Sequence, residues 1–503
     1  MGKFLIRLTR IDVKQLWAIT ILVGIFVFIN THPIRPHDFW WHLALGKEIA
    51  ATYQIPSRDI FSFTMFGQAY PSYQMFWFFD LGLYAFYLSG GPALVILVTS
   101  IIITSAYAII MLICWQSSRH WGATALALFF AAALGIHNWN VRPQVISYLI
   151  GAAFLYAIYA YRRNPGTKWL AVFPIGMLVW VNSHGSFPIG FILLGIWLGD
   201  EIWNQIVRKH DGNYQTSLLT LKGPGLALLL SGLVLFINPR GPGIITYVAN
   251  LSGNPVIQNL VPEWAPPTFD NQIGIIFYLG LILCSVVLAI SPRRPNFFQM
   301  AFYICFAILS LMTTRGIVWF GLVMAPVLAV HFAASAEHYF NKTEKKKTIK
   351  YRQLLNTLFV LILGGMAIIS LPWFKHRLPF EGSKSGLISK ETPEKATDLL
   401  LEQGPPGYLF NEMGFGSYLI WAAQPRYQVF VDPRIELFTS EIWNDYIYIS
   451  NALPGWQQKL NEYGINTLML SPAKQANLIA ALGKANNWSS IYQDESAHIY
   501  TRK

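Results

Sequence analysis

Long apolar runs recur through the first 372 residues and alternate with short polar loops. A helix that crosses the hydrocarbon core of a bilayer needs about 20 mainly apolar residues, and most of these runs approach that length. The pattern therefore predicts a polytopic α-helical membrane protein with about eleven transmembrane helices. The expected helices lie at 15–31, 92–115, 121–137, 145–161, 169–182, 186–203, 224–238, 273–291, 297–313, 316–335 and 354–371.

The composition agrees with that class. The chain has 503 residues, of which 54% are hydrophobic and 12% are charged, and its mean hydropathy is +0.40. Such a chain is too apolar to be a soluble globule. Its net charge of +12 comes mostly from short basic blocks between apolar runs, a pattern that sets membrane topology and does not indicate nucleic-acid binding. The three cysteines lie in separate apolar runs and predict neither a disulfide framework nor a zinc site.

The direction in which the chain crosses the membrane depends on segment 73–89. This segment is apolar but short, contains Asp80, and is followed by Gly90-Gly91-Pro92. If it lies on the outer surface as an amphipathic helix, most Lys and Arg residues fall on the cytoplasmic side, including those at the N-terminus and in the run 342–352. If it spans the membrane, the bias inverts. The positive-inside rule favours the surface helix, with a cytoplasmic N-terminus in the inner membrane.

This topology places the unusual polar motifs of the membrane domain on the outer side. The first external loop, 32–91, carries Asp38. The later external turns carry Arg142, then Asn182 and His184, then Arg240 and Glu263, and finally Arg315. The three isolated arginines are poor topology signals on the side that has few positive charges. A guanidinium group forms bidentate hydrogen bonds with phosphoryl oxygens, so the arginines predict a phosphate-binding site.

The first external loop opens on the motif Arg35-Pro36-His37-Asp38-Phe39-Trp40-Trp41-His42. A carboxylate at a membrane interface is costly, and indole rings favour that depth. Asp38 is therefore the leading catalytic candidate. His42 lies four residues further on and would share a helical face with Asp38, where it could hydrogen-bond the carboxylate or share a cation with it.

Residues 376–503 have the composition of a soluble domain. We expect an external, periplasmic α/β domain, separate from a transmembrane domain at 1–372. The pattern predicts strands at 407–410, 428–431, 467–470 and 498–501, the last at an edge, and helices at 416–421, 456–463 and 473–482. The pair Asp432 and Arg434 follows the second strand and marks the expected binding edge.

The layout resembles that of the GT-C superfamily of integral-membrane glycosyltransferases. The segments DFWWHLALGKEI, IPSRDIFSFT, RPQ, VNSHGSF and VDPRIEL are similar to those of a bacterial GT-C-like group without assigned substrate. The resemblance implies a donor made of a sugar on a polyprenyl phosphate. It also implies that the first-loop acid, by position Asp38, activates the acceptor or coordinates a metal. The chain departs from the paired-acid pattern, because Phe39 follows Asp38, and Glu263 is the candidate replacement for the second acid.

The expected reaction is transfer of the sugar to a glycan, lipid or protein acceptor at the outer face of the membrane. Arg142, Arg240 and Arg315 would bind the donor phosphate, and Asp38 would accept the proton of the acceptor hydroxyl. Residues expected to contact the sugar or acceptor are Trp40, Trp41, Asn182, His184, Asp432 and Arg434. No cofactor is expected, although His37, Asp38 and His42 form a partial ligand set for a divalent cation.

Simpler interpretations stay open for the same residues. Asp38 could cap the helix that follows it. Trp40 and Trp41 could be interfacial anchors, and each arginine could interact only with lipid head groups. Asp432 and Arg434 could form a structural ion pair. Two other functional classes also remain: a transporter and a catalytically silent scaffold that binds lipid or polyprenyl phosphate.

Overall fold

The computed structural model describes residues 12–210, 219–253, 261–340, 350–378, 384 and 386–503. The chain divides into two compact units. The first contains Met1–His32, Ile96–Pro242 and Val261–Lys384, and the second contains Pro33–Val95, Gly243–Leu260 and Ser385–Lys503. We predicted a boundary after residue 372. We did not predict that the first loop would belong to the same unit as the C-terminal residues. Most of the predicted basic run 342–352, like the N-terminal basic residues before Asp12, lies outside the described residues.

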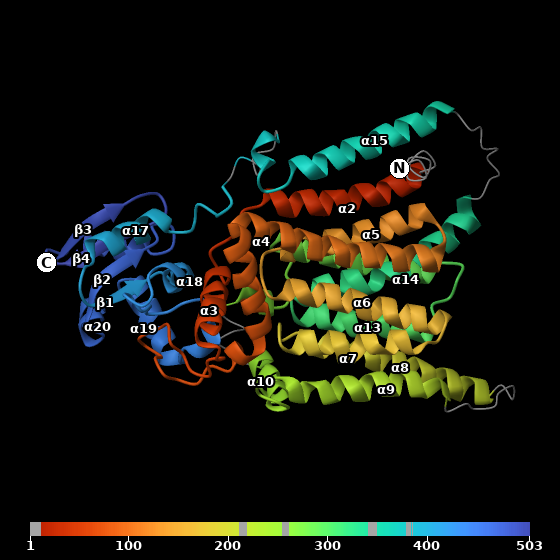
Figure 1. Ribbon diagram of the computed structural model, residues 1–503, viewed down its shortest axis with the longest axis horizontal. Helices are drawn as coiled ribbons and strands as arrows, with labels where there is room; N and C mark the ends of the chain where they lie inside the picture. The colour runs from red at the N-terminus through yellow and green to blue at the C-terminus, as the bar shows by residue number, and fades with distance from the viewer. Residues whose placement is uncertain (1–11, 211–218, 254–260, 341–349, 379–383, 385) are drawn as a thin grey trace. The chain divides into compact units, whose positions relative to one another are not determined.

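The first unit is a helical bundle. Its helices are α2 (Val13–Thr31), the second part of α4 (Ser72–Ser118), α5 (Trp121–Gly135), α6 (Gln144–Arg163), α7 (Thr167–Val181), α8 (Pro188–His210), α9 (Leu219–Val234), α12 (Gln272–Ile290), α13 (Phe297–Met312), α14 (Gly316–Phe340) and α15 (Lys350–Ile369). Helix α5 packs against α2 and α14, α13 packs against α14, and α7 packs against α6 and α9 (Figure 1). Each apolar run that we identified coincides with one of these helices.

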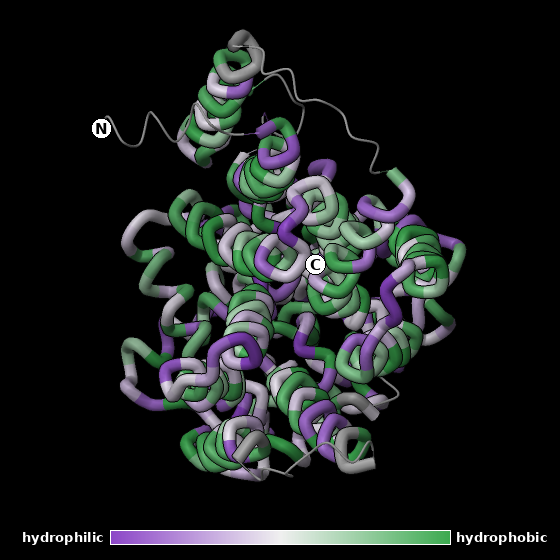
Figure 2. The backbone as a smooth tube through the Cα atoms, turned by 90° about the vertical axis from the view of Figure 1, so that its right-hand side faces the viewer, coloured by the Kyte–Doolittle hydropathy of each residue, from purple (hydrophilic) through white to green (hydrophobic). Residues whose placement is uncertain are grey.

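Hydrophobic residues dominate most helical turns (Figure 2). Among the described residues, the helices that are long and apolar enough to cross a membrane are α2, α4, the stretch Trp121–Asn138, α6, α12 and α14; shorter apolar helices lie at 167–181, 221–237, 297–312 and 354–369. Helix α14 is apolar on nearly every face and is buried along most of its length, as expected for a central helix. The total of about eleven spans stays a prediction.

The predicted break after residue 89 is confirmed. Helix α4 leaves helical geometry at Gly90, with φ −160° and ψ 18°, and at Gly91, with φ 61° and ψ −160°. A residue with a β-carbon rarely adopts the conformation of Gly91, so glycine permits the bend, and Pro92 then starts the next helical stretch.

The second unit combines the first loop with a small α/β fold. Its sheet has the order β1-β2-β4-β3, with β1 (Tyr408–Asn411) parallel to β2 (Ile465–Leu470), and β4 (His498–Arg502) antiparallel to both β2 and β3 (Trp488–Gln493). The helices of this unit are α3 (Phe39–Thr52), the first part of α4, α10 (Gly243–Ser252), α17 (Glu394–Gln403), α18 (Met413–Ala422), α19 (Ser440–Ser450), α20 (Trp456–Glu462) and α21 (Ala476–Leu482). Helix α18 packs against α3.

Two of the predictions for this sheet are wrong. Strand β4 lies between β2 and β3 and is not an edge, because the strand at 488–493 was not recognised. Residues 428–431 do not join the sheet. They pair instead with the first loop, where Phe63 N donates to Val429 O at 3.1 Å and Val429 N donates to Phe61 O at 3.2 Å. The apolar run was read correctly as extended, but its partner is distant in sequence.

Asn411 connects this extended segment to the sheet. Its side-chain amide donates to Val431 O at 2.8 Å and accepts from Phe430 N at 2.9 Å. Thr64 Oγ1 donates to Phe430 O at 2.6 Å from the loop side. Residues 430–431 therefore bridge the end of β1 and the first loop. Side chains form the hydrogen bonds to their backbone groups that a neighbouring strand would otherwise form.

Candidate functional site

The first unit contains a cluster of two arginines around one carboxylate. Arg142 precedes α6, Glu263 lies in the short 3-10 helix η3 (Pro262–Trp264), and Arg315 precedes α14. Arg142 Nη1 donates to Glu263 Oε1 at 2.6 Å. Arg315 donates to Glu263 Oε2 through Nε at 3.2 Å and through Nη2 at 3.1 Å. Three residues from three predicted external loops thus meet in one place.

The backbone holds this arrangement. Arg315 N donates to Glu263 O at 3.1 Å, and Thr314 N donates to Ala265 O at 2.9 Å. The Arg315 guanidinium also lies over the Trp264 ring, 4.7 Å from its centroid. The turn before α14 is so tight that only glycine fits at position 316. A β-carbon added there would lie 2.7 Å from Leu309 O. The chain therefore fixes where Arg315 stands relative to Glu263.

The electrostatics of the cluster favour an anion. Burial by itself would raise the pKa of Glu263, but the guanidinium groups of Arg142 and Arg315 outweigh it and lower the pKa to about 2. Glu263 is therefore ionised at neutral pH and is a weak base. One carboxylate faces two guanidinium groups, so the three side chains carry one excess positive charge. The exposed fractions are 15% for Arg142, 31% for Glu263 and 36% for Arg315, so solvent reaches the cluster.

The turn after α7 supplies neighbouring polar groups. Asn182 accepts a hydrogen bond from the side chain of Asn238 at 3.2 Å, and Asn238 also donates to Val181 O at 3.1 Å. The Arg240 backbone N–H donates to Asn238 Oδ1 at 2.9 Å, and the Arg240 residue is exposed. Burial and the positive charge of Arg315 lower the pKa of His184 to about 3. Of the three predicted phosphate ligands, Arg142 and Arg315 share one carboxylate, and Arg240 lies beside Asn238.

The aromatic motif of the first loop lies in the second unit. Asp38 occupies the N-cap position of α3, but its side chain accepts no capping hydrogen bond, so the simple capping interpretation does not describe it. Trp40 and Trp41 are both buried. Trp40 stacks against Trp421 with ring centroids 6.4 Å apart. Because both indole rings are buried, they do not form an open platform for a sugar or a pair of anchors exposed at the membrane interface.

His42 has a partner that we did not predict. Its Nδ1 lies 2.7 Å from Asp80 Oδ1, and both side chains are buried. The expected partners were Asp38 and a cation. Within the described parts of the chain, no group of three or more His, Cys, Asp or Glu residues is arranged to hold a metal ion. Asp80 lies 38 residues further along the chain than His42, so only the packing of α3 on α4 could reveal the pair.

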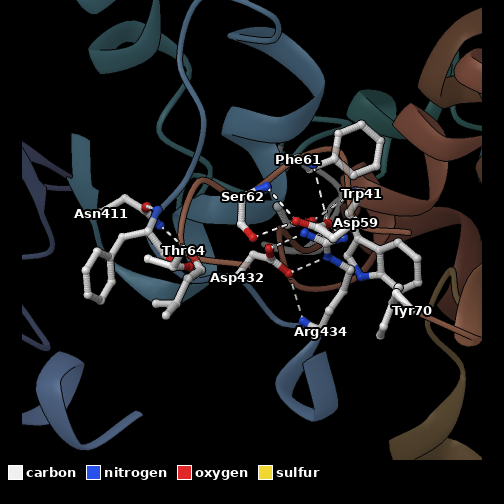
Figure 3. A network of polar contacts seen from close by, with 12 residues as sticks. Trp41, Asp59, Phe61, Ser62, Thr64, Tyr70, Asn411, Asp432 and Arg434 are labelled. Carbon is white, nitrogen blue, oxygen red and sulfur yellow. Dashed lines mark hydrogen bonds and ion pairs between the residues drawn. The ribbon is translucent and has the colours of Figure 1, made fainter. Parts of the chain in front are cut away.

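Arg434 is the centre of a buried network in the second unit (Figure 3). It donates to Asp432 through Nε at 2.8 Å and through Nη2 at 2.6 Å, and to Asp59 Oδ1 through Nη1 at 2.5 Å. Nη1 also hydrogen-bonds Tyr73. Burial by itself would raise the pKa of Asp59, but the charge of Arg434 and hydrogen bonds from Ser62 lower it overall. The structural ion pair that we considered for Asp432 and Arg434 is present, and Asp59 extends it.

The comparisons with known proteins concern the fold. No known protein-family model matches this chain, and no curated protein sequence matches it. Among solved structures, ArnT from Cupriavidus metallidurans in the apo state is similar over 96% of this chain and 97% of that chain, with a TM-score of 0.52 and 11% sequence identity. ArnT from the same organism bound to undecaprenyl phosphate has a TM-score of 0.49 and 12% identity, over the same shares of the two chains.

ArnT is a GT-C glycosyltransferase, and the similarity to its apo structure shows that this chain has a GT-C-like fold. Together with the long apolar helices, that fold makes the chain a multi-pass membrane protein. At 11% identity the similarity defines the fold and leaves the chemistry to the residues of this chain.

Proposed function

We propose that this protein is a membrane glycosyltransferase that moves a sugar from a polyprenyl-phosphate-linked donor to an acceptor at the outer face of the membrane. The observation that carries the proposal is the convergence of Arg142 and Arg315 on one partly exposed carboxylate. The GT-C-like fold supports the same class, and one of the similar ArnT structures is bound to undecaprenyl phosphate.

The arginine cluster suits a phosphoryl group. The Glu263 carboxylate presents two oxygens to two guanidinium groups, as a phosphate would. The excess positive charge of the cluster attracts a further anion, and partial exposure allows one to approach. In this proposal the donor phosphate binds to Arg142 and Arg315 by sharing or displacing Glu263, and the exposed Arg240 adds positive charge.

The proposed transfer is a single displacement. The oxygen of the acceptor hydroxyl forms a bond to the anomeric carbon, the bond from that carbon to the phosphate oxygen breaks, and the polyprenyl phosphate leaves with the bonding electrons. The hydroxyl proton passes to Asp38 as general base. Arg142 and Arg315 offset the negative charge that develops on the leaving phosphate. Glu263 competes with the phosphate for the two arginines and, with its lowered pKa, is not the base.

The test replaces each arginine by lysine, which keeps the charge but loses the planar fork. We expect purified Arg142→Lys and Arg315→Lys proteins in nanodiscs to bind undecaprenyl phosphate about tenfold more weakly, since each loses one charge-assisted hydrogen bond. Transfer from a panel of polyprenyl-phosphate hexoses should fall with binding.

Arg162 provides a matched control. It is also ion-paired, to Asp200 at 2.5 Å, and it lies over the Phe298 ring, but it stands at the end of α6 that we predict to be cytoplasmic. Arg162→Lys should bind the lipid phosphate as the wild type does. Unchanged affinity in both Arg142→Lys and Arg315→Lys would reject a phosphate site, and binding by the wild type without transfer from any donor would favour a scaffold.

A further inference from the structure

A groove of about 640 Å³ lies between α2, α5 and α15 of the first unit. It is lined by residues within 13–21, 125–129 and 355–362, and all of these except Thr20 and Asn356 are apolar. Helix α2 packs against both α5 and α15 (Figure 1). The volume of the groove lies in the range of about 300–1,000 Å³ that is typical of sites for small ligands.

The groove opens at the surface of the bundle. Trp17, Leu126 and Leu355, one from each lining helix, are 52%, 54% and 63% exposed. In a membrane-spanning bundle, apolar side chains that are exposed in this way face the hydrocarbon core of the bilayer. The lining therefore suits a hydrocarbon chain.

The groove is distant from the arginine cluster. The lining helices α2, α5 and α15 all begin at the end of the bundle that we predict to be cytoplasmic, and the groove lies along their first and middle turns. Arg142 follows the opposite end of α5, a helix of 15 residues that is about 22 Å long. A lipid in the groove would thus have its head group at the cytoplasmic leaflet, whereas the arginine cluster belongs to the predicted outer side.

A lysine lies where the groove approaches the start of α5. Gly122 precedes Ala125 and Leu126 by one turn, on the same face of α5. A β-carbon added at Gly122 would lie 3.6 Å from Lys14 Cδ, so the Lys14 side chain crosses the first turn of α5. Lys14 and Arg119 are both exposed, and neither forms an ion pair with another residue that the structure describes.

We propose that the groove binds an anionic phospholipid of the cytoplasmic leaflet, with one acyl chain along the apolar lining and the phosphate at Lys14. Asp12 brings one negative charge to the start of α2, and Lys14 and Arg119 outweigh it, so this end of the groove favours an anion. The bound lipid fills the space between α5 and α15 and stabilises α15, the helix that precedes the C-terminal residues. This site does not depend on the proposed sugar transfer.

The test measures the binding of two phospholipids to the purified, delipidated full-length protein. Phosphatidylglycerol and phosphatidylcholine with identical acyl chains would be compared by native mass spectrometry and by the shift in Tm that each produces. We expect the wild type to bind phosphatidylglycerol about fivefold more tightly than phosphatidylcholine, and to gain more in Tm from it. This ratio is the effect of one basic side chain on an anionic head group.

Two variants separate the head group from the acyl chain. Lys14→Gln should bind phosphatidylglycerol about fivefold more weakly and phosphatidylcholine as the wild type does. Leu126→Trp places a larger side chain in the groove and should weaken the binding of both lipids. Because Lys14 is exposed, Lys14→Gln should fold normally, and it keeps the test decisive if Leu126→Trp does not fold.

Matched controls come from helices that do not line the groove. Lys168 is an exposed lysine at the start of α7 that lies over the Trp169 ring, 4.8 Å from its centroid. Leu279 of α12 is 62% exposed. Lys168→Gln and Leu279→Trp should both bind phosphatidylglycerol as the wild type does.

Several results would overturn the proposal. The first is a wild type that binds neither phospholipid, or that binds both equally. The second is unchanged phosphatidylglycerol binding in Lys14→Gln. The third is displacement of phosphatidylglycerol by an equal concentration of undecaprenyl phosphate, which would assign the groove to the donor lipid. Arg142→Lys and Arg315→Lys should keep the binding of phosphatidylglycerol even where they lose undecaprenyl phosphate, so the failure of either site can be told from failure of the other.

Discussion

The two compact units each contain an arginine–carboxylate cluster, and the two clusters have opposite compositions. In the first unit, Arg142 and Arg315 share the single carboxylate of Glu263, and all three side chains are partly exposed. In the second unit, Arg434 is shared by Asp59 and Asp432, and all three side chains are fully buried. The first cluster has an excess positive charge that solvent can reach, and the second has an excess negative charge that it cannot.

This difference in charge and exposure distinguishes a candidate binding site from a structural cluster. A buried guanidinium that already donates to two carboxylates and a tyrosine has little capacity left for a ligand, and its removal would leave charges uncompensated in the interior. A partly exposed pair of arginines with one carboxylate can exchange that carboxylate for a phosphate. The sequence offered Arg142 and Arg315, and also Asp432 and Arg434, as ligand candidates, with a structural ion pair left open for the second pair. The ratio of charges together with exposure distinguishes the two clusters.

The largest effect that we expect concerns the buried cluster. Arg434→Met should destabilise the second unit by about 3–5 kcal/mol, because Asp59 and Asp432 would remain as unpaired buried charges. Thermal unfolding and the yield of folded protein would measure the loss. Adding Asp59→Asn and Asp432→Asn to the same protein should recover part of the stability. A stable Arg434→Met protein that loses only activity would place Arg434 with the binding residues and remove the contrast.

Substitution of Asp38 tests whether the second unit also contains a catalytic residue. Asp38→Asn cannot accept the acceptor proton, so turnover should fall by roughly 100-fold if general-base catalysis operates. Asn has nearly the size of Asp and is as good an N-cap residue, so Asp38→Asn should keep the stability of the wild type, unlike the Arg434 variant. Turnover with polyprenyl-phosphate hexoses and thermal stability would be measured together. Near-normal turnover in the Asn variant would exclude Asp38 from the mechanism.

The smallest effect should come from Glu263. Glu263→Gln removes the anion that competes for Arg142 and Arg315, so we expect undecaprenyl phosphate to bind about threefold to tenfold more tightly, with stability changed by less than about 1 kcal/mol for this partly exposed pair. Weaker binding would instead show that the charge of Glu263 is needed to orient the arginines.

The lowered pKa of Glu263 predicts how the effect of Glu263→Gln should depend on pH. The folded-state pKa of Glu263 is about 2, below the value of about 4.3 in an unfolded chain. The stabilisation by this ion pair is therefore fully present above pH 4.3 and is lost as the pH falls toward 2. Between pH 5 and 8 the ratio of affinities of wild type and Glu263→Gln should stay constant. A ratio that changes across pH 6 would point to a titrating group other than Glu263.

Several elements could be predicted from local pattern. The apolar runs identified the helices of the bundle, and Gly90-Gly91-Pro92 identified the break in α4, because hydrophobic length and backbone freedom are properties of the nearby residues themselves. The resemblance of the motifs to the GT-C superfamily agrees with the observed fold. The grouping of Arg142, Glu263 and Arg315 was suggested in part, since their loops were predicted on one side of the membrane.

Other features depended on contacts between residues far apart in the chain. The extended run at 428–431 had the local character of a strand, but pairing with Phe61 and Phe63 is a property of the tertiary fold. The burial of Trp40 and the pairing of His42 with Asp80 were hidden for the same reason. The sequence by itself determined which segments are helical and which side chains are chemically able to act. Only the tertiary structure decided which charges meet and which of them water can reach, because an ion pair depends on distance and dielectric environment, and neither is encoded in the local pattern.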